Sequence, residues 1–307
     1  MHPFRFAVQQ ASAPNGEAWA TIARRAESLG YDVLVMPDHL GRQLSPVAAL
    51  ATAAAATTRL RVCAFVFAND YRHPLILARE AATLDLLSGG RFEMGLGAGW
   101  MTADYCRIGM KYDPPPRRVD RLEEAIPLVK RLLSGETVTF TGQHYCLEKA
   151  FAGVQPVQKP RPPLAIGAGR PRMLKLAARE AEIVGLTPGF DASGRIIVRQ
   201  ATETAVAEKI RLIRDAAGDG FERLEINLWL GAAGMVGSGN SLLGSTAAAG
   251  AWAATALYGS PFVLHGTLGA LRERLLRRRD KLGISYYTVP ARSMEAMAPL
   301  VEALAGK

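Results

Sequence analysis

The chain has few residues that could form disulfide bonds or bind metals. Its 307 residues include only three cysteines and five histidines. Cys63, Cys106 and Cys146 lie far apart and form no Cys-x-x-Cys pair, which favours reduced thiols in a cytoplasm over a disulfide framework. The histidines show no His-Glu-x-x-His or similar ligand spacing, so the sequence predicts no metal site.

Long apolar runs are also missing. No stretch approaches the roughly 18 uninterrupted apolar residues of a membrane helix. The N-terminal residues Met1–Phe6 lack the apolar core of a signal peptide. These absences predict a cytoplasmic protein that does not enter a membrane.

Positive charge exceeds negative charge, with 37 basic and 28 acidic residues and a net charge of +9. Such an excess can indicate nucleic acid or an anionic small molecule as a partner. The densest basic run, Arg277–Arg279, lies in a helical pattern without interleaved aromatic residues. That context favours a solvated helix face and argues against nucleic acid, while an anionic cofactor or substrate is a second source of the excess.

Short apolar runs alternate with helical patterns along almost the whole chain. Such alternation predicts parallel βαβ units, and eight of them predict a closed (β/α)8 TIM barrel, an α/β fold that typically needs about 250 residues. We therefore expect a single domain over residues 1–307. The expected strands are 4–9, 32–36, 60–67, 92–96, 164–166, 183–186, 224–230 and 284–289, and the expected helices are about 18–29, 45–57, 74–87, 118–133, 171–181, 201–216, 267–282 and 293–305.

Two segments interrupt this alternation. The β-prone stretch Thr137–Leu147 contains a turn residue, Gly142, and predicts an inserted hairpin at about 136–150. Residues 231–260 are rich in Gly, Ala and Ser. This second insertion is either a lid over the barrel mouth or a mobile linker, and the sequence favours neither.

An acidic residue and a histidine stand together after the second expected strand. Pro37 ends this strand, and Asp38 and His39 follow it. The carboxyl ends of barrel strands carry catalytic residues, and a histidine can hold a proton near neutral pH. His39 is therefore a candidate proton donor with Asp38 beside it. The alternative is that Asp38 caps the next segment and His39 is an ordinary loop residue.

Two glycine-rich turns follow later strands. The turn Gly97-Ala98-Gly99-Trp100 resembles part of a dinucleotide fingerprint. Either the strand end needs small residues, or a flat ring lies against this backbone. The turn Gly167-Ala168-Gly169-Arg170 precedes Pro171 and a helix, so its backbone N–H groups and guanidinium predict a phosphate site, with a plain βα turn as the alternative.

Several blocks of the sequence resemble the luciferase-like monooxygenase superfamily, and within it most closely the coenzyme F420-dependent oxidoreductases. The blocks are Met36–His39, Tyr71–Asp85, Ser88–Trp100, Ser260–Leu264 and Leu282–Tyr287. The resemblance implies a (β/α)8 barrel with insertions, a homodimer, and coenzyme F420 at the barrel mouth. FMN is the alternative cofactor, because FMN-dependent members share the Ser-Gly-Gly-Arg turn. A non-proline cis peptide bond near Phe65-Val66 is also implied.

The resemblance extends to individual site residues. In related sugar-phosphate dehydrogenases the Asp-His pair contacts the cofactor and acts as acid/base, which carries onto Asp38 and His39. Those relatives have a glutamate directly after the glycine loop, where this chain has Trp100. This difference argues against sugar-phosphate dehydrogenase activity and makes the pocket more apolar. The expected cofactor contacts are Asp38, Phe65, Val66, Ala68, Gly97, Ala98, Gly99, Trp100, Gly167, Ala168, Gly169, Arg170 and Met173.

The expected function is hydride transfer between F420 and a small organic substrate, with reduction of a C=C or C=N bond and His39 as the proton donor. One alternative is a reduced-FMN-dependent monooxygenase. Another is a non-catalytic cofactor-binding protein, suggested by Trp100 in place of the acid. Candidates for lining an apolar substrate pocket are Phe65, Trp100, Tyr105, Phe190, Trp229 and His265.

Overall fold

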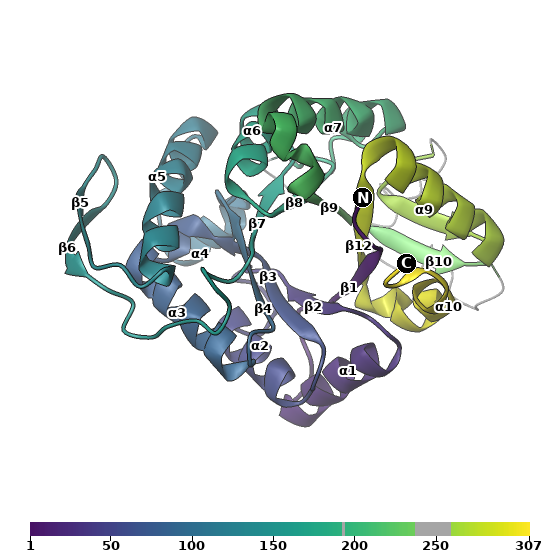
Figure 1. The fold of residues 1–307 in the computed structure, drawn as a ribbon, viewed down its shortest axis with the longest axis horizontal. Coiled ribbons are helices and arrows are strands. Elements are labelled where there is room, and N and C mark those ends of the chain that lie inside the picture. Colours follow the sequence, from purple (N-terminus) through teal and green to yellow (C-terminus); the bar gives the residue numbers. More distant parts are fainter. Residues whose placement is uncertain (192–193, 237–258) are drawn as a thin grey trace.

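A computed structural model describes residues 1–191, 194–236 and 259–307. Eight parallel strands close into a barrel in the order β1-β12-β9-β8-β7-β4-β3-β2, and helices surround it (Figure 1). The expected TIM barrel and all eight expected strands are confirmed. The strands are β1 (Arg5–Gln9), β2 (Val33–Met36), β3 (Arg61–Ala68), β4 (Phe92–Gly97), β7 (Leu164–Ala168), β8 (Ile183–Leu186), β9 (Glu225–Trp229) and β12 (Ile284–Pro290).

The helices begin and end at residues suited to those positions. The Asn15 side chain accepts a hydrogen bond from the Ala18 backbone N–H at the start of α1, and Gly283 adopts a left-handed conformation at the end of α9. The expected helices are α1 (Gly16–Ser28), α2 (Pro46–Ala55), α3 (Pro74–Leu87), α5 (Pro115–Leu133), α6 (Pro171–Glu180), α7 (Glu203–Ala217), α9 (Leu268–Leu282) and α10 (Met294–Leu304). A short helix that the sequence did not predict, α4 (Thr102–Arg107), follows β4.

The barrel interior has an apolar layer and a charged layer. Side chains that alternate along the strands form the apolar layer, which consists of Ala7, Val33, Val35, Cys63, Ala165, Ile183 and Tyr286 with Phe65 against them. Near the strand starts, Arg5 forms ion pairs with Glu93 and Glu225, and Arg61 bonds to Glu93 over 2.7 Å. This charged layer closes the amino end of the barrel, so the opposite end is left for a ligand.

The hairpin expected at 136–150 is present as the antiparallel pair β5 (Val138–Thr141) and β6 (Cys146–Ala150). It projects from the barrel beside α5 in Figure 1. A parallel pair that was not expected, β10 (Ala232–Met235) and β11 (Val263–Gly266), bounds the second insertion. The lid or linker expected at 231–260 lies mostly outside the described residues, at 237–258.

The peptide bond between Phe65 and Val66 is cis, as the resemblance implied. It lies where the register between β3 and β4 shifts, between Ala64 and Phe67. No helix in the described ranges is long and apolar enough to cross a membrane. Across the same ranges, no group of three or more His, Cys, Asp and Glu side chains is placed to hold a metal ion.

Candidate active site

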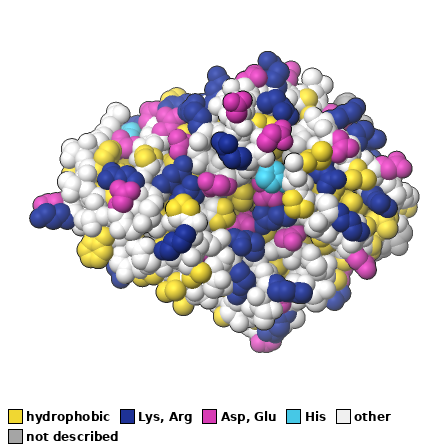
Figure 2. All heavy atoms as spheres, in the orientation of Figure 1, with side chains coloured by type: hydrophobic (Ala, Val, Ile, Leu, Met, Phe, Trp, Pro, Cys, Tyr) yellow, Lys and Arg dark blue, Asp and Glu magenta, His cyan; other side chains and the backbone are white. Residues whose placement is uncertain are grey.

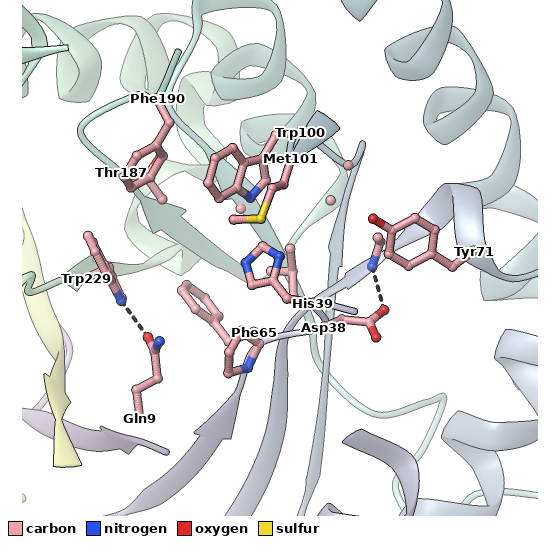
Figure 3. Close-up of a pocket in the computed structure, with 16 residues that line it drawn as sticks. Gln9, Asp38, His39, Phe65, Tyr71, Trp100, Met101, Thr187, Phe190 and Trp229 are labelled. Atoms are coloured by element: carbon pink, nitrogen blue, oxygen red, sulfur yellow. Dashed lines mark hydrogen bonds between the residues drawn. The ribbon is translucent and has the colours of Figure 1, made fainter. Parts of the chain in front are cut away.

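A pocket opens at the carboxyl ends of the barrel strands (Figure 3). It receives residues from the ends of β1, β2, β3, β4, β7 and β9 and from the loop after β8. Both expected proton-transfer residues and many of the expected cofactor contacts line it. The lining residues are Gln9, Pro37, Asp38, His39, Phe65, Val66, Ala68, Tyr71, Gly97, Gly99, Trp100, Met101, Gly167, Thr187, Phe190 and Trp229.

His39 is held by a carboxylate that the sequence did not reveal. Its Nδ1 lies 2.7 Å from Oδ2 of Asp104, a residue of α4 with no exposed side-chain surface. The other Asp104 oxygen accepts hydrogen bonds from the Leu40 backbone N–H (3.2 Å) and from Arg107 (2.8 Å). An ionised carboxylate only accepts, so it places the hydrogen of the imidazole on Nδ1. Nε2 is then the nitrogen that can exchange a proton with a ligand.

Asp38 also lines the pocket, but its carboxylate points away from His39 (Figure 3). One oxygen accepts from the Ala68 backbone N–H at 3.0 Å and from Arg72 at 2.5 Å. The other lies 3.3 Å from the same guanidinium. A buried carboxylate held by an arginine and a backbone N–H fixes the end of β3 beside the ring-sized pocket. This geometry fits a positioning role better than direct proton transfer.

Aromatic side chains form one wall of the pocket. Trp100 stacks on Phe190 with ring centroids 5.0 Å apart, and Phe190 packs edge-on against Trp229 at 5.9 Å. The edge of His39 meets Trp100 at 5.5 Å. On the other side, burial together with Asp104 and Asp38 raises the pKa of Tyr71, so its hydroxyl keeps its proton at neutral pH. The wall offers an apolar surface beside the imidazole.

Glycine is needed at two positions that line the pocket, because a larger residue there would clash with neighbouring side chains. A Cβ on Gly97 would lie 2.6 Å from the Val66 side chain, and one on Gly99 would lie 2.1 Å from the Tyr105 hydroxyl. Gly99 also has a positive φ of 73°. The strand end therefore needs small residues, which was one of the two alternatives for this turn. The pocket can still receive a flat ring, because these glycines lie along its edge.

A second pocket adjoins the first and shares Gly99, Trp100, Gly167, Thr187 and Phe190 with it. It contains the expected contacts Ala98, Gly169, Arg170 and Met173, and α6 begins there with Pro171 directly after Arg170. Because the N-terminus of a helix attracts anions, this pocket suits a phosphate group. Ala168, in contrast, is buried and lines neither pocket.

The strongest sign of an anion in the second pocket is Arg118, which the sequence did not single out. The residue is only 4% exposed, and its Nε and Nη1 have no hydrogen-bond partner within the described ranges. Its guanidinium lies 4.3 Å from the Tyr112 ring centroid. A buried guanidinium without a carboxylate is costly unless a ligand supplies the negative charge.

Two of the aromatic and histidine candidates do not reach the barrel mouth. Tyr105 is fully buried, and its hydroxyl donates to Asp70 over 2.8 Å. His265 lies on β11 and lines a different pocket. Phe65, Trp100, Phe190 and Trp229 do line the mouth, as expected. Helical periodicity cannot reveal α4 because it has only six residues, and Asp104 was missed with it. The available signal was an acid five residues after Gly99.

The fold and the pocket define a (β/α)8 barrel with a histidine–carboxylate pair at its carboxyl mouth. A model of the luciferase-like monooxygenase family matches residues 1–216. The chain therefore belongs to the luciferase-like monooxygenase family, and the resemblance expected from the sequence is confirmed.

The relatives include an F420-dependent enzyme and a monooxygenase. An F420-dependent glucose-6-phosphate dehydrogenase of Microbacterium testaceum is 33% identical over 174 residues, which are 54% of this chain and 51% of the relative. A 4-hydroxyprotoasukamycin monooxygenase of Streptomyces nodosus is 34% identical over 152 residues, 48% of this chain and 40% of the relative. The chain thus spans about half the length of the curated relatives it matches.

Solved structures agree on the fold. The coenzyme F420-dependent tetrahydromethanopterin reductase from Methanopyrus kandleri superposes with a TM-score of 0.78, covering 98% of this chain and 99% of that one. The two share 17% sequence identity, so the likeness shows the fold alone.

Proposed function

We propose that this protein is a coenzyme F420-dependent oxidoreductase that transfers a hydride between the deazaflavin and a small organic substrate. One observation carries the proposal: His39, oriented by Asp104, faces a pocket that continues into a second pocket containing Arg118. The first pocket suits a flat ring, and the second suits the phosphate of its side chain. The F420-dependent relative supports this cofactor over others.

The residues present fit such a cofactor. When bound, the deazaflavin supplies the hydride, while the protein supplies orientation and a proton. Val66, Gly97 and Gly167 are the residues that would lie beside the ring. Arg118 and Arg170 would hold the phosphate, which satisfies the buried guanidinium nitrogens of Arg118.

The proton comes from His39 in this proposal. Asp104 holds Nδ1, so the proton transferred to substrate resides on Nε2, and the negative charge of Asp104 stabilises the protonated ring. A positioned proton donor typically contributes about 10²–10⁴-fold to the rate. Asp38 contributes by holding the end of β3 through Ala68.

The substrate class follows from the wall that faces His39. Trp100, Phe190 and Trp229 offer apolar faces, and the Gln9 amide beside them accepts a hydrogen bond from the Trp229 indole N–H at 2.5 Å. A small, mainly apolar molecule with a C=C or C=N bond fits these surroundings. Trp100 occupies the position of the acid expected for a sugar-phosphate dehydrogenase, so a phosphorylated sugar is not proposed.

The test is anaerobic oxidation of reduced F420 with a panel of unsaturated ketones and imines. We expect His39→Gln to reduce turnover by at least about a hundredfold while cofactor affinity stays the same. His2→Gln is the matched control. The His2 ring contacts the Glu222 backbone carbonyl, far from the pocket. Full turnover by His39→Gln with normal cofactor binding would remove His39 from the mechanism.

A reduced-FMN-dependent monooxygenase is the second candidate, supported by the Streptomyces monooxygenase relative. FMN also has a phosphate, so the second pocket suits both cofactors. Oxygen uptake with reduced FMN and substrate, without any substrate-dependent oxidation of reduced F420, would establish this rival. If neither cofactor is turned over although one binds, the protein is a non-catalytic cofactor-binding protein.

Two further expectations remain part of the proposal. Cys63, Cys106 and Cys146 are all unpaired, which supports action in the cytoplasm. A homodimer is proposed from the family resemblance, and light scattering of the purified protein measures it. No nucleic-acid or membrane partner is proposed.

A further inference from the structure

A third pocket, remote from the barrel mouth, lies between α7 and α9. It is lined by Glu203 and Ala207 of α7, by residues around β11 including Ser260 and His265, and by one face of α9. Arg274, Arg277, Arg278 and Lys281 form that face. We call these four residues the α9 basic face. Lys and Arg side chains are frequent on the surface over α9 in Figure 2.

Helical spacing brings the four cations together. They occupy positions i, i+3, i+4 and i+7, so their side chains share one side of the helix, where like charges repel. They span about 10 Å along the helix axis at about 1.5 Å per residue. Burial lowers the pKa of Arg278, and the charges of Arg274 and Arg277 lower it further. Arg278 is buried on this face, so its charge is costly unless another group offsets it.

The described part of the chain supplies little of that offset. Arg278 is 5% exposed, and its guanidinium donates to the Pro261 carbonyl over 3.4 Å. Arg274 donates to the His265 carbonyl over 3.4 Å. No ion pair with a carboxylate involves the α9 basic face within the described residues, whereas the partly buried Arg5, Arg72 and Arg121 each form one. Glu203 is the one acidic residue that lines the pocket.

Residues 237–258, outside the described ranges, cannot supply the missing carboxylates. Their sequence contains no aspartate or glutamate. Glu273 and Asp280 of α9 are exposed, line no part of the pocket and form no ion pair with the α9 basic face in the described residues, so a ligand from solution can supply counter-charge there. This is the observation that turns a basic helix face into a candidate binding site.

We infer that the α9 basic face is a binding site for a small anion with two linked phosphate groups. Four cations minus Glu203 leave about three positive charges, which matches a diphosphate near neutral pH. The length of the face exceeds what a single phosphate covers, whereas a diphosphate reaches cations one helical turn apart. Guanidinium groups bind phosphate oxygens in pairs, which suits Arg277 and Arg278. Ala207, Val263 and Leu282 also line the pocket and offer apolar surface to a nucleoside.

The test is isothermal titration of the full chain with pyrophosphate, ADP and orthophosphate. We expect saturable binding of pyrophosphate, with orthophosphate much weaker. Tighter binding of ADP than of pyrophosphate identifies a nucleotide as the ligand, and equal binding identifies the inorganic anion. Arg277→Gln combined with Lys281→Gln should weaken pyrophosphate binding at least tenfold, roughly the loss expected for one charged hydrogen bond. Both side chains are exposed, so the fold should persist, and a melting curve checks this.

Two controls separate this site from other sources of binding. Arg272→Gln changes an exposed arginine on the same helix that does not line the pocket, and should leave the affinity unchanged. Arg170→Gln removes a cation of the proposed cofactor phosphate pocket, so binding that it abolishes belongs to that pocket, while the affinity of the α9 basic face for pyrophosphate should be unchanged. The inference is overturned if millimolar pyrophosphate gives no saturable binding, or if only Arg170→Gln abolishes it. It is also overturned if a short DNA duplex binds through Arg277 and Lys281 while pyrophosphate does not.

Discussion

Asp104→Asn tests the pairing of His39 with a buried carboxylate. The substitution keeps the size of the side chain and removes its negative charge. Because the asparagine amide can donate as well as accept, it no longer fixes the hydrogen of His39 on Nδ1. We expect turnover at neutral pH to fall, since the protonated ring loses a stabilising charge and the bond that orients it.

The size of the effect follows from the contact. A hydrogen bond to a charged group is worth about 1.5–3 kcal/mol, or about 10- to 160-fold at about 1.36 kcal/mol per factor of ten. Asp104 has no exposed surface, but the His39 side chain is 29% exposed. Solvent therefore screens part of the interaction, and we expect a loss of about tenfold, towards the lower end of that range.

Three measurements distinguish positioning from a general loss of structure. Proton NMR should show a downfield Nδ1–H resonance of His39 in the wild type and its loss in Asp104→Asn. Turnover should fall with little change in cofactor affinity. Arg107→Gln is the matched control, because Arg107 bonds to the same carboxylate over 2.8 Å but is half exposed and does not contact His39. Wild-type turnover and a wild-type Nδ1–H resonance in folded Asp104→Asn would refute the reasoning.

Three other substitutions test the fold and the second pocket. Burial raises the pKa of Glu225 from its ordinary 4.5 to about 7. Between these two pH values the folded protein holds a proton that the unfolded chain has lost. The free energy of unfolding, measured by urea, should therefore fall by up to about 3 kcal/mol between about pH 4.5 and pH 7. This fall should be smaller in Glu225→Gln, and an equal fall in the variant and the wild type would contradict the assignment. Arg118→Met should weaken cofactor binding about tenfold yet raise the melting temperature without cofactor, because it removes an unpaired buried charge. Unchanged cofactor affinity would place the phosphate elsewhere. Gly97→Ala should lower the free energy of unfolding by about 1–3 kcal/mol, because the new Cβ would lie 2.6 Å from the Val66 side chain. An unchanged free energy of unfolding would mean that β3 shifts to accommodate the methyl group at little cost.

The barrel could be predicted from the sequence because its signal is local and repeated. Each strand, such as Val33–Met36, is a short apolar run, and each helix shows a 3.6-residue period, so eight repeats indicate the closed fold. The strand pair β10 and β11 was not predicted from the sequence, because Ala232, Ala233 and Gly234 have little β-propensity. Their strand conformation comes from pairing with Val263–Gly266, more than 25 residues away in sequence.

The site could be predicted only in part, because its partners come from different elements. His39, Trp100 and the Gly167 turn follow strand ends and were located from the strand pattern. Asp104 and Arg118 lie on helices, and no sequence spacing shows that Asp104 reaches His39 or that two guanidinium nitrogens of Arg118 find no hydrogen-bond partner in the described part of the chain. Asp38 was expected to act beside His39, whereas Arg72 holds its carboxylate on the other side.

The most direct test of the proposed function is a paired titration of the purified apo-protein with F420 and with FMN, followed by the quenching of cofactor fluorescence. The proposal predicts saturable binding of F420 that is much tighter than that of FMN, and weaker F420 binding in Arg118→Met. Tight binding of FMN with no measurable binding of F420 would contradict it.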